Sequence, residues 1–319
     1  MKLLFFNDFK LGVYDGDAVI DVSGAVADLA PAHPQELLTT VITRWSEFED
    51  KIRQVAEQGT GVPLDSVRVR PPVPRPLNID CMARNYMEGA TERPPINGFP
   101  KTPHSIVGHG DRMVLPDIPA TVFEGEAELA VVIGRRAQNV SVDEALDHVF
   151  GYTNLIDGSA RGIPPRQNAF YQMKSRETFC PIGPFLVTAD EVPDPQNLPV
   201  RLWTNGTLMQ DFNTDDMAYS VAESIAFVSS LHTLEPGDLV ATGTTHGGLH
   251  PLMHGDVVEL EVGGLGRLRI NVHDDLKRTW KRETRHDRAL AGLDGTAPQL
   301  SGKYTPETAQ ARSARTARH

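Results

Sequence analysis

The stretch "FEGEAELAVVIGRR", residues 123–136, decides the fold. Its second half contains AVVI, which lacks polar alternation and is typical of a strand covered on both faces. Glu124, Glu126 and Glu128 stand at every second position before it, and side chains two apart on a strand share one face. Such carboxylates either lie at a solvated sheet edge or, beside a buried strand, need a compensating cation. The covered strand favours the second interpretation, in which a third carboxylate completes a site for Mg2+, Mn2+ or Ca2+.

Polar residues downstream of this strand are candidates for the same site. Asp157 lies in "GYTNLIDGSARG", residues 151–162, with Arg161 close to it, although an Asp-Gly pair by itself is only a turn signal. Lys174 follows a loop rich in Pro and Gly, where most lysines are solvated. Beside a metal, however, a lysine binds a carboxylate or stabilises a developing enolate.

Three histidines follow one another in the loop "TGTTHGGLHPLMHG", residues 242–255. His246, His250 and His254 stand at four-residue steps, which on a helix would align them as zinc ligands. The glycines and the proline between them make that helix improbable. The sequence therefore does not favour a three-histidine zinc site.

Outward from residues 123–136, strands outnumber helices. The Asn205-Gly206 pair predicts a hairpin turn, and "GGLGRL", residues 263–268, is typical of another turn rather than of a dinucleotide loop. Helices are predicted only near 142–149 and 215–231 in this part of the chain. Because strands and helices do not alternate regularly, we expect an α+β fold built on mixed, rolled sheets. The predicted strands are "PFLVTA", "VRLWTNGTLMQ", "GDLVATG", "GDVVELEV" and "GRLRINV".

The two ends of the chain differ from this central part. Residues 1–24 predict a hairpin with an Asp-Gly turn, and residues 34–58 have the apolar spacing of an amphipathic helix. The proline-rich stretch 67–78 cannot continue a helix and marks a boundary. We therefore predict a small N-terminal α+β domain (1–70), a larger domain of mixed, rolled sheets (71–282), which the family resemblance given below implies to be a catalytic β-roll, and, because it is polar and lacks periodicity, a loose tail (283–319).

Composition limits the partners of the protein. The 319 residues carry a net charge of -11, which disfavours binding to nucleic acid or to an anionic membrane. The expected partners are a small molecule and other copies of the chain. Cys81 and Cys180 form no disulfide framework, and the N-terminus lacks the apolar core of a signal peptide. No apolar run has membrane-spanning length, so we expect a cytoplasmic protein.

Taken together, these pieces resemble the fumarylacetoacetate hydrolase family from about residue 70 to 275. The start of the chain also looks like the small N-terminal domain common in that family. Seven motifs occur in the family's order, which makes the resemblance specific. They are "RNYMEGATE", "EAELAVVIG", "GYTNLIDGSAR", "KSRETFCPIGPFLVT", "LWTNGTLMQDFNTDDM", "LEPGDLVATGT" and "GDVVELEVGGLG".

The resemblance implies a β-roll that holds one Mg2+ or Mn2+, with Ca2+ as a possible substitute in a crystal. Glu126 and Glu128 match the family's E-x-E pair and Asp157 its aspartate, so these three are the implied metal ligands. Glu124 lies outside the motif, at the rim. Lys174 matches the lysine that contacts substrate oxygens, and Arg161 and Thr244 match substrate-binding positions. The implied substrates are 2-oxo and 2,4-dioxo acids.

The chain departs from the family where hydrolytic members activate water. Their segment resembles N-Y-x-x-H-x-x-E, and here Glu92 is present but Gly89 occupies the histidine position. A carboxylate alone is a weak base at neutral pH. His246 is the preferred substitute because it follows the T-G-T motif at the site, whereas His104 and His109 are poorer candidates.

Three further departures concern the rest of the pocket. Ile156 stands where asparagine is usual, Gly162 where aspartate is usual, and Glu177 replaces an aspartate.

We expect a metal-dependent hydrolase that cleaves a carbon–carbon bond in a 2,4-dioxo acid of a catabolic pathway, working as a homodimer. The alternative is a lyase or isomerase: a 2-keto-3-deoxy acid dehydratase, an oxo-acid decarboxylase or a tautomerase. Both proceed through an enolate, but only hydrolysis needs an activated water.

Overall fold

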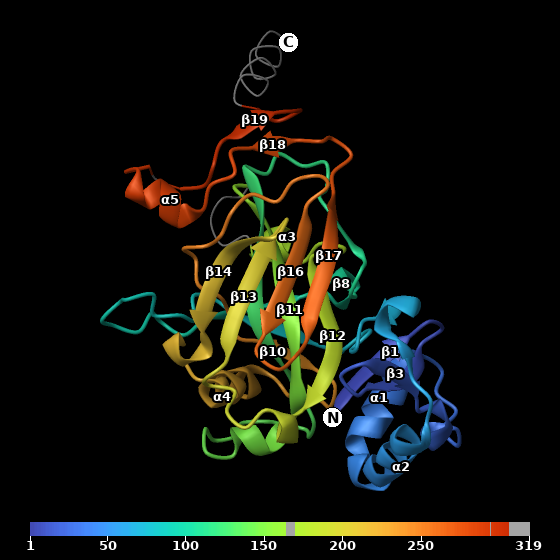
Figure 1. Ribbon diagram of the computed structural model, residues 1–319. Helices are drawn as coiled ribbons and strands as arrows, with labels where there is room; N and C mark the ends of the chain where they lie inside the picture. Colours follow the sequence, from blue (N-terminus) through green and yellow to red (C-terminus); the bar gives the residue numbers. More distant parts are fainter. Residues whose placement is uncertain (164–169, 294, 306–319) are drawn as a thin grey trace, which may run out of the picture.

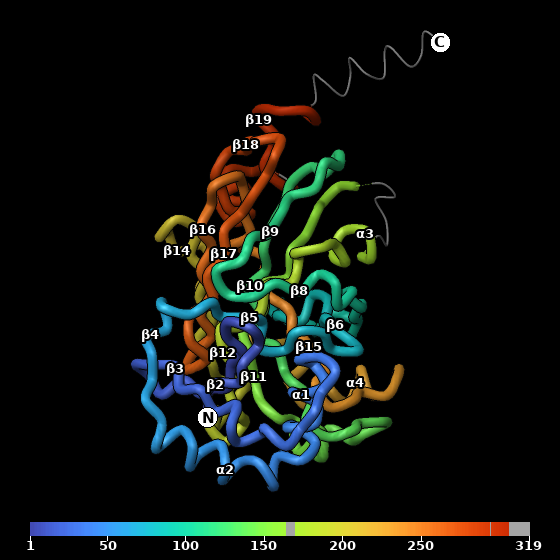
Figure 2. The backbone as a smooth tube through the Cα atoms, turned by 90° about the vertical axis from the view of Figure 1, so that its right-hand side faces the viewer, coloured from blue at the N-terminus to red at the C-terminus, as the bar shows by residue number. Residues whose placement is uncertain are grey.

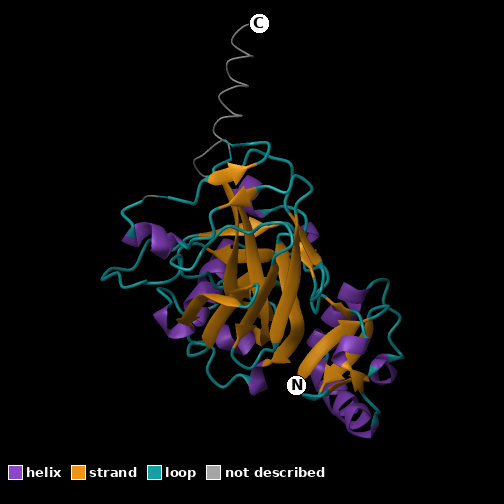
Figure 3. Cartoon of the chain, turned by 45° about the horizontal axis from the view of Figure 1, so that its top comes forward, coloured by secondary structure: helices purple, strands orange, loops and turns teal. Residues whose placement is uncertain are grey.

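The computed structural model describes residues 1–163, 170–293 and 295–305. It is an α+β fold in which a long mixed sheet and a five-stranded sheet pack face to face, with helices mainly at the periphery (Figures 1 and 3). The predicted fold class is confirmed. In spatial order the long sheet contains β4 (Val62–Pro63), β3 (Ala18–Asp21), β2 (Lys10–Tyr14), β1 (Lys2–Phe6), β12 (Cys180–Thr188), β11 (Val149–Arg161), β10 (Val122–Ile133), β15 (Leu239–Ala241), β6 (Ile79–Met82) and β7 (Gly98–Lys101).

Shorter strands complete these sheets. In the long sheet β5 (Val69–Arg70) pairs with β1, and β8 (Ile106–Val107) pairs with β12. The second sheet closes over β10–β12 and carries both predicted hairpins, with turns at Asn205-Gly206 and at 263–266. Its strands, in spatial order, are β14 (Thr207–Asn213), β13 (Pro199–Thr204), β16 (Val257–Val262), β17 (Arg267–His273) and β9 (Arg112–Val114).

Strand β10 is buried at all twelve positions because it separates two hydrophobic cores. Leu129 and Val131 belong to the core shared with the second sheet. Ala130 and Val132 belong to the core shared with the N-terminal strands and helices. Apolar side chains are therefore needed on both faces, which explains the absence of alternation in AVVI. The three glutamates share the face of Ala130 and Val132.

The helices differ from the prediction in their bounds. The predicted helix 34–58 is two helices, α1 (Pro34–Thr43) and α2 (Trp45–Gln58), because the backbone of Arg44 leaves the helical region and its carbonyl accepts the N–H of Glu47. Near 142–149 only one 3-10 turn forms, Ala145–His148, since the chain enters β11 at Val149. Helix α4 (Val221–Leu231) begins after Ser220, which forms a capping box with Glu223.

The N-terminal hairpin is confirmed, and its strand β1 continues the long sheet by pairing with β12. Helices α1 and α2 cover this end of the molecule, on the opposite side from β18 and β19 (Figure 2). Because one sheet runs through both parts, the division at residue 70 stays a prediction. In the described part of the chain, no helix has the length and apolar character needed to cross a bilayer.

The prediction of a loose tail from residue 283 is wrong for the described residues up to 305. The chain forms a two-stranded ribbon of β18 (Thr279–Trp280) and β19 (Gln299–Ser301), with helix α5 (Arg285–Leu290) between them. Buried Trp280 anchors the ribbon by donating from Nε1 to the carbonyl of Thr121 at 2.7 Å. Ion pairs stabilise the segment. They could not be predicted, because a composition rich in polar residues does not show which charged side chains pair. Residues 306–319 lie outside the described part.

Candidate metal centre and active site

The register of β10 and β11 assembles the predicted acidic triad. Glu126 stands directly opposite Asp157 across the antiparallel pair, and Glu128 follows Glu126 on the same face. All three side chains are buried, and one oxygen from each lies within 4.8 Å of the others. The E-x-E spacing and one strand register therefore bring together carboxylates about thirty residues apart in the sequence.

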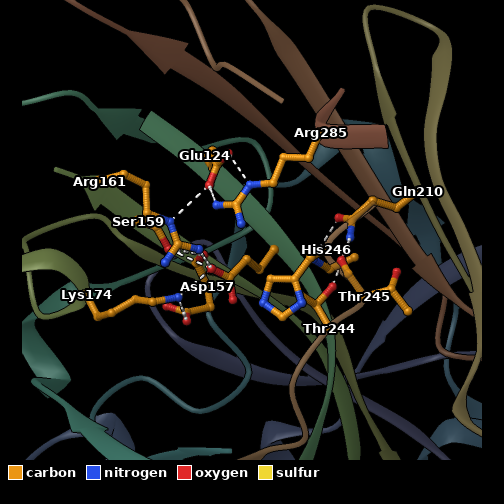
Figure 4. A network of polar contacts seen from close by, with 12 residues as sticks. Glu124, Asp157, Ser159, Arg161, Lys174, Gln210, Thr244, Thr245, His246 and Arg285 are labelled. Atoms are coloured by element: carbon orange, nitrogen blue, oxygen red, sulfur yellow. Dashed lines mark hydrogen bonds and ion pairs between the residues drawn. The ribbon is translucent and has the colours of Figure 1, made fainter. Parts of the chain in front are cut away.

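Basic side chains contact the triad, and Figure 4 shows Arg161 and Lys174 beside Asp157. The Nζ of Lys174, at the end of the short helix α3 (Phe170–Lys174), donates to Glu126 Oε1 at 2.6 Å and to Asp157 Oδ2 at 2.5 Å. Arg161, at the end of β11, donates from Nη2 to the same oxygen of Glu126. A second buried lysine, Lys101 of β7, donates to Asp157 Oδ1 at 2.5 Å. Lys101 was not predicted from the sequence, where its only signal is its apolar setting in "GFPKTP".

The two glutamates of the triad differ in ionisation. Burial opposes the charge of Glu126, but Lys174 and Arg161 outweigh it and hold the pKa of Glu126 well below its usual value. Burial, and then the negative charges of Asp157 and Glu126, raise the pKa of Glu128 well above its usual value. Like charges brought this close in a buried site push carboxyl pKa values apart. Split pKa values are frequent at functional sites.

The donor set fits a divalent metal ion. Glu128 Oε1 is buried and has no hydrogen-bond partner among the described residues, and a buried carboxylate oxygen without a partner is costly. Three carboxylates are hard oxygen ligands of the kind that Mg2+ and Mn2+ prefer. A metal here would stabilise negative charge on a substrate oxygen as a Lewis acid.

The motif T-G-T, residues 242–244, directly follows the neighbouring strand β15 and holds Glu128. The backbone N–H of Gly243 donates to Glu128 Oε2 at 2.7 Å. Gly243 has a φ of +87°, and a Cβ there would lie 3.0 Å from the Cβ of Asn85. This backbone contact requires glycine, because other residues rarely adopt such a φ and the space is already filled.

His246 contacts Glu88, a residue that was not predicted from the sequence as part of the site. Its Nδ1 lies 2.7 Å from Oε2 of Glu88, and its backbone N–H also donates to the Glu88 carboxylate. Burial raises the pKa of Glu88, but the bonds from His246 and Gly247 outweigh this and leave that pKa below its usual value. Glu88 has a φ of +48°, rare for a residue with a side chain, and Asp216 holds its backbone N–H at 3.0 Å.

A cavity of about 570 Å³ joins these groups. Thr244 is buried in its wall and accepts a hydrogen bond from Gln210 Nε2 at 2.9 Å. Glu92 is exposed at its edge. The predicted site residues Glu92, Glu126, Arg161, Lys174, Thr244 and His246 all line this cavity, as do Glu88 and Arg285.

The other histidines considered as candidates lie apart from this cavity. His250 is buried with Nε2 2.8 Å from Thr204 Oγ1, and burial lowers its pKa to about 4. His254 accepts the N–H of Asp274, and His109 accepts that of Arg269. The triad is the one metal-ligand group found among the described residues, so the three-histidine zinc interpretation finds no support. His104 lines a separate groove beside α1.

Two departures from the family motifs have local explanations. Ile156 is fully buried in the core between the sheets. Gly162 has a φ of +71°, and a Cβ there would lie 2.0 Å from Thr121 Oγ1, so a side chain is excluded. Glu177 is exposed and does not line the cavity.

The fold and the site define a rolled α+β protein with a buried three-carboxylate centre suited to a divalent ion. Residues 78–273 match the family model described as Fumarylacetoacetate (FAA) hydrolase C-terminal, and the chain belongs to this family, whose characterised members are enzymes. This accounts for the sequence motifs and for their order.

Relatives in this family carry different activities. Oxaloacetate tautomerase YisK of Bacillus subtilis is 37% identical over 221 residues, covering 64% of this chain and 73% of that protein. Maleylpyruvate hydrolase of Aquipseudomonas alcaligenes is 32% identical over 290 residues, covering 85% of this chain and 99% of that protein. The crystal structure of maleylpyruvate hydrolase from Sphingobium sp. SYK-6 with manganese(II) and pyruvate is 32% identical, with a TM-score of 0.77, covering 86% of this chain and 99% of that one.

Proposed function

We propose that the protein is a divalent-metal-dependent hydrolase that cleaves the carbon–carbon bond of an acylpyruvate, a 2,4-dioxo acid of the maleylpyruvate type. The observation that carries the proposal is the His246–Glu88 pair, which lines the same cavity as Glu126 and Lys174. This pair supplies the base that the family motif loses at Gly89. The manganese and pyruvate in a related structure support a metal centre that acts on 2-oxo acids.

The residues take distinct parts in this reaction. The metal, held by Glu126, Glu128 and Asp157, would supply Lewis-acid stabilisation of the enolate that leaves as pyruvate. His246 accepts a proton through Nε2 from the water that attacks the distal carbonyl carbon, and returns this proton to the enolate carbon when the carbon–carbon bond breaks. Glu88, bonded to Nδ1, holds the imidazole orientation and stabilises its charged form.

The charges of the site suit a dianionic substrate. Four carboxylates and four basic side chains lie in one connected network, so a divalent ion adds two positive charges that a substrate with two carboxylates offsets. The network contains Glu124, Glu126, Glu128, Asp157, Lys101, Arg161, Lys174 and Arg285.

A second candidate function is the tautomerisation of oxaloacetate. It needs a metal and one base that moves a proton between carbon and oxygen, and the His246–Glu88 pair also suffices for that. Similarity to an oxaloacetate tautomerase of Bacillus subtilis favours this candidate. Water then plays no part in the reaction.

Isotope labelling separates the two candidates. The protein with Mn2+ is incubated with maleylpyruvate in water enriched in oxygen-18, and the products are weighed by mass spectrometry. The hydrolase gives pyruvate and maleate with the label in a maleate carboxylate. Intact maleylpyruvate, together with accelerated enol–keto conversion of oxaloacetate, would instead identify a tautomerase. A His246→Gln variant, which lacks the proposed base, serves as the control. Light scattering on the same sample tests the expected homodimer.

A further inference from the structure

The chain beyond the family match returns to the active site. The match ends at residue 273, yet Arg285 of α5 lines the cavity. Two backbone hydrogen bonds dock this segment on the loop that carries His246: Arg285 N–H to the carbonyl of Leu249, and His286 N–H to that of Gly247, both at 2.9 Å. Residues 284–286 therefore join the loop of the proposed base to the strand of the acidic triad.

The link to that strand is Glu124, the first glutamate of the E-x-E-x-E series. The guanidinium of Arg285 donates two hydrogen bonds to the Glu124 carboxylate, from Nε to Oε1 at 3.0 Å and from Nη2 to Oε2 at 2.5 Å. Arg161 reaches the same carboxylate only through Nε, at 2.9 Å to Oε2. Figure 4 shows Arg161 and Arg285 approaching Glu124 from different elements.

This arrangement fixes the direction of Arg161. A carboxylate and a guanidinium pair best through two parallel hydrogen bonds. Because Arg285 occupies both oxygens of Glu124, Arg161 makes a single contact there and turns its Nη2 toward Glu126 and the cavity. Without Arg285, Glu124 is free to pair with Arg161 through two bonds, which draws Nη2 away from Glu126.

We propose that Arg285 is a positioning residue of the active site, supplied by the segment outside the family domain, which acts through Glu124 to hold Arg161 toward the substrate. The effect on substrate rests on the proposed function. The effect on the metal site does not, because Arg161 competes with a metal ion for Glu126 whatever the reaction is.

Two replacements of Arg285 separate position from charge. In Arg285→Gln, we expect the KM for the 2-oxo acid substrate to rise about 10-fold with a smaller change in kcat, because Arg161 is turned away from the cavity. Arg285→Lys keeps the charge but cannot form the two parallel bonds, so its KM should rise similarly. Adding Glu124→Gln to Arg285→Gln removes the competing carboxylate and should restore most of the loss.

Metal titration without substrate gives an independent measurement. Calorimetry with Mn2+ alone should show several-fold tighter binding by Arg285→Gln than by the wild type, since Glu126 loses a competing cation. A merely structural lesion would weaken binding instead. If the proposed reaction is wrong, no KM can be measured, and the affinity of the Mn2+-loaded protein for oxalate is measured in its place. The matched control is Arg288→Gln on the same helix, whose side chain pairs with Glu283 and does not line the cavity.

The results that overturn the proposal are equally defined. Wild-type KM, oxalate affinity and Mn2+ affinity in Arg285→Gln would refute it. Full activity in Arg285→Lys would show that charge alone matters, and failure of Glu124→Gln to rescue would remove the competition argument. Circular dichroism of each variant checks the fold, and Arg285→Lys decides the matter if Arg285→Gln does not fold.

Discussion

Two buried charged clusters in this protein differ in how completely they are satisfied. In the first, fully buried Arg278 donates through Nε and Nη2 to both oxygens of Asp274 at 2.9 Å, and its other contacts go to backbone carbonyls, among them those of Ile118 and Pro116. In the second, the triad of Glu126, Glu128 and Asp157 gathers three buried carboxylates, of which Glu126 lines the cavity, and Glu128 Oε1 has no hydrogen-bond partner among the described residues.

The difference separates structure from function. A buried ion pair with every nitrogen matched holds the C-terminal ribbon on the sheet and offers nothing to a ligand. A cluster in which one carboxylate has a raised pKa, and an oxygen with no partner in the described part of the chain, is costly unless a ligand completes it. An unsatisfied hydrogen-bonding group, rather than burial alone, therefore marks the functional cluster.

The largest expected effect comes from Glu128→Gln. This change keeps the shape of the side chain but removes a metal ligand, so kcat/KM with Mg2+ or Mn2+ should fall on the order of 10³-fold. Because the charge of Glu128 is disfavoured in the fold, the melting temperature should stay the same or rise. Kinetics and a thermal melt without metal check both parts. A large loss of stability with retained activity would place Glu128 with the structural cluster.

Asp274→Asn should show the reverse pattern. It leaves the buried charge of Arg278 with a neutral partner, and breaking a buried pair in this way costs about 3–5 kcal/mol of unfolding free energy. Urea denaturation measures the loss, and Mn2+ affinity of the folded fraction should be unchanged. Weakened metal binding at full stability would contradict the assignment of Asp274 to structure alone.

A smaller effect is expected at the proposed base. His246→Gln removes proton transfer and should lower kcat about 10²-fold, while Glu88→Gln should lower it less because the imidazole remains. Metal affinity serves as the control and should change little in either variant. Equal kcat for the wild type and His246→Gln would exclude the histidine from the reaction.

The smallest effect concerns pH. Glu128 must be ionised to bind metal, and its pKa is raised above the usual 4.5. Protons therefore compete with the ion for Glu128 as the pH falls toward the raised pKa. Mn2+ affinity should therefore rise with pH, with up to one proton released per ion, and level off above the raised pKa. Calorimetry in two buffers of different ionisation enthalpy counts the protons. An affinity that does not change with pH above 4.5 would contradict the raised pKa.

Much of the fold could be predicted because its signals are local. The lack of alternation in β10, the Asn205-Gly206 turn and the E-x-E spacing depend on neighbouring residues. Asp157 joins the triad through one strand register, and its role came from the family motif. His246 was expected from its place after T-G-T, and the structure puts it in the cavity.

The residues that escaped prediction depend on contacts between distant parts of the chain. Glu88 reaches His246, 158 residues away, through an uncommon backbone conformation that Asp216 supports. Buried Lys101 of β7 donates to Asp157, 56 residues away in the sequence. Arg285 lies in a polar segment whose order comes from Glu124, 161 positions earlier in the sequence. Composition and periodicity contain no record of such pairings.

The central claim is that the triad of Glu126, Glu128 and Asp157 is a metal centre. A Mn2+ titration of the wild type and of Glu128→Gln, under conditions in which both proteins are fully folded, tests it most directly. We predict that the wild type binds one ion per chain and that Glu128→Gln binds at least about 100-fold more weakly. Equal affinity of the two proteins for Mn2+ would contradict the claim.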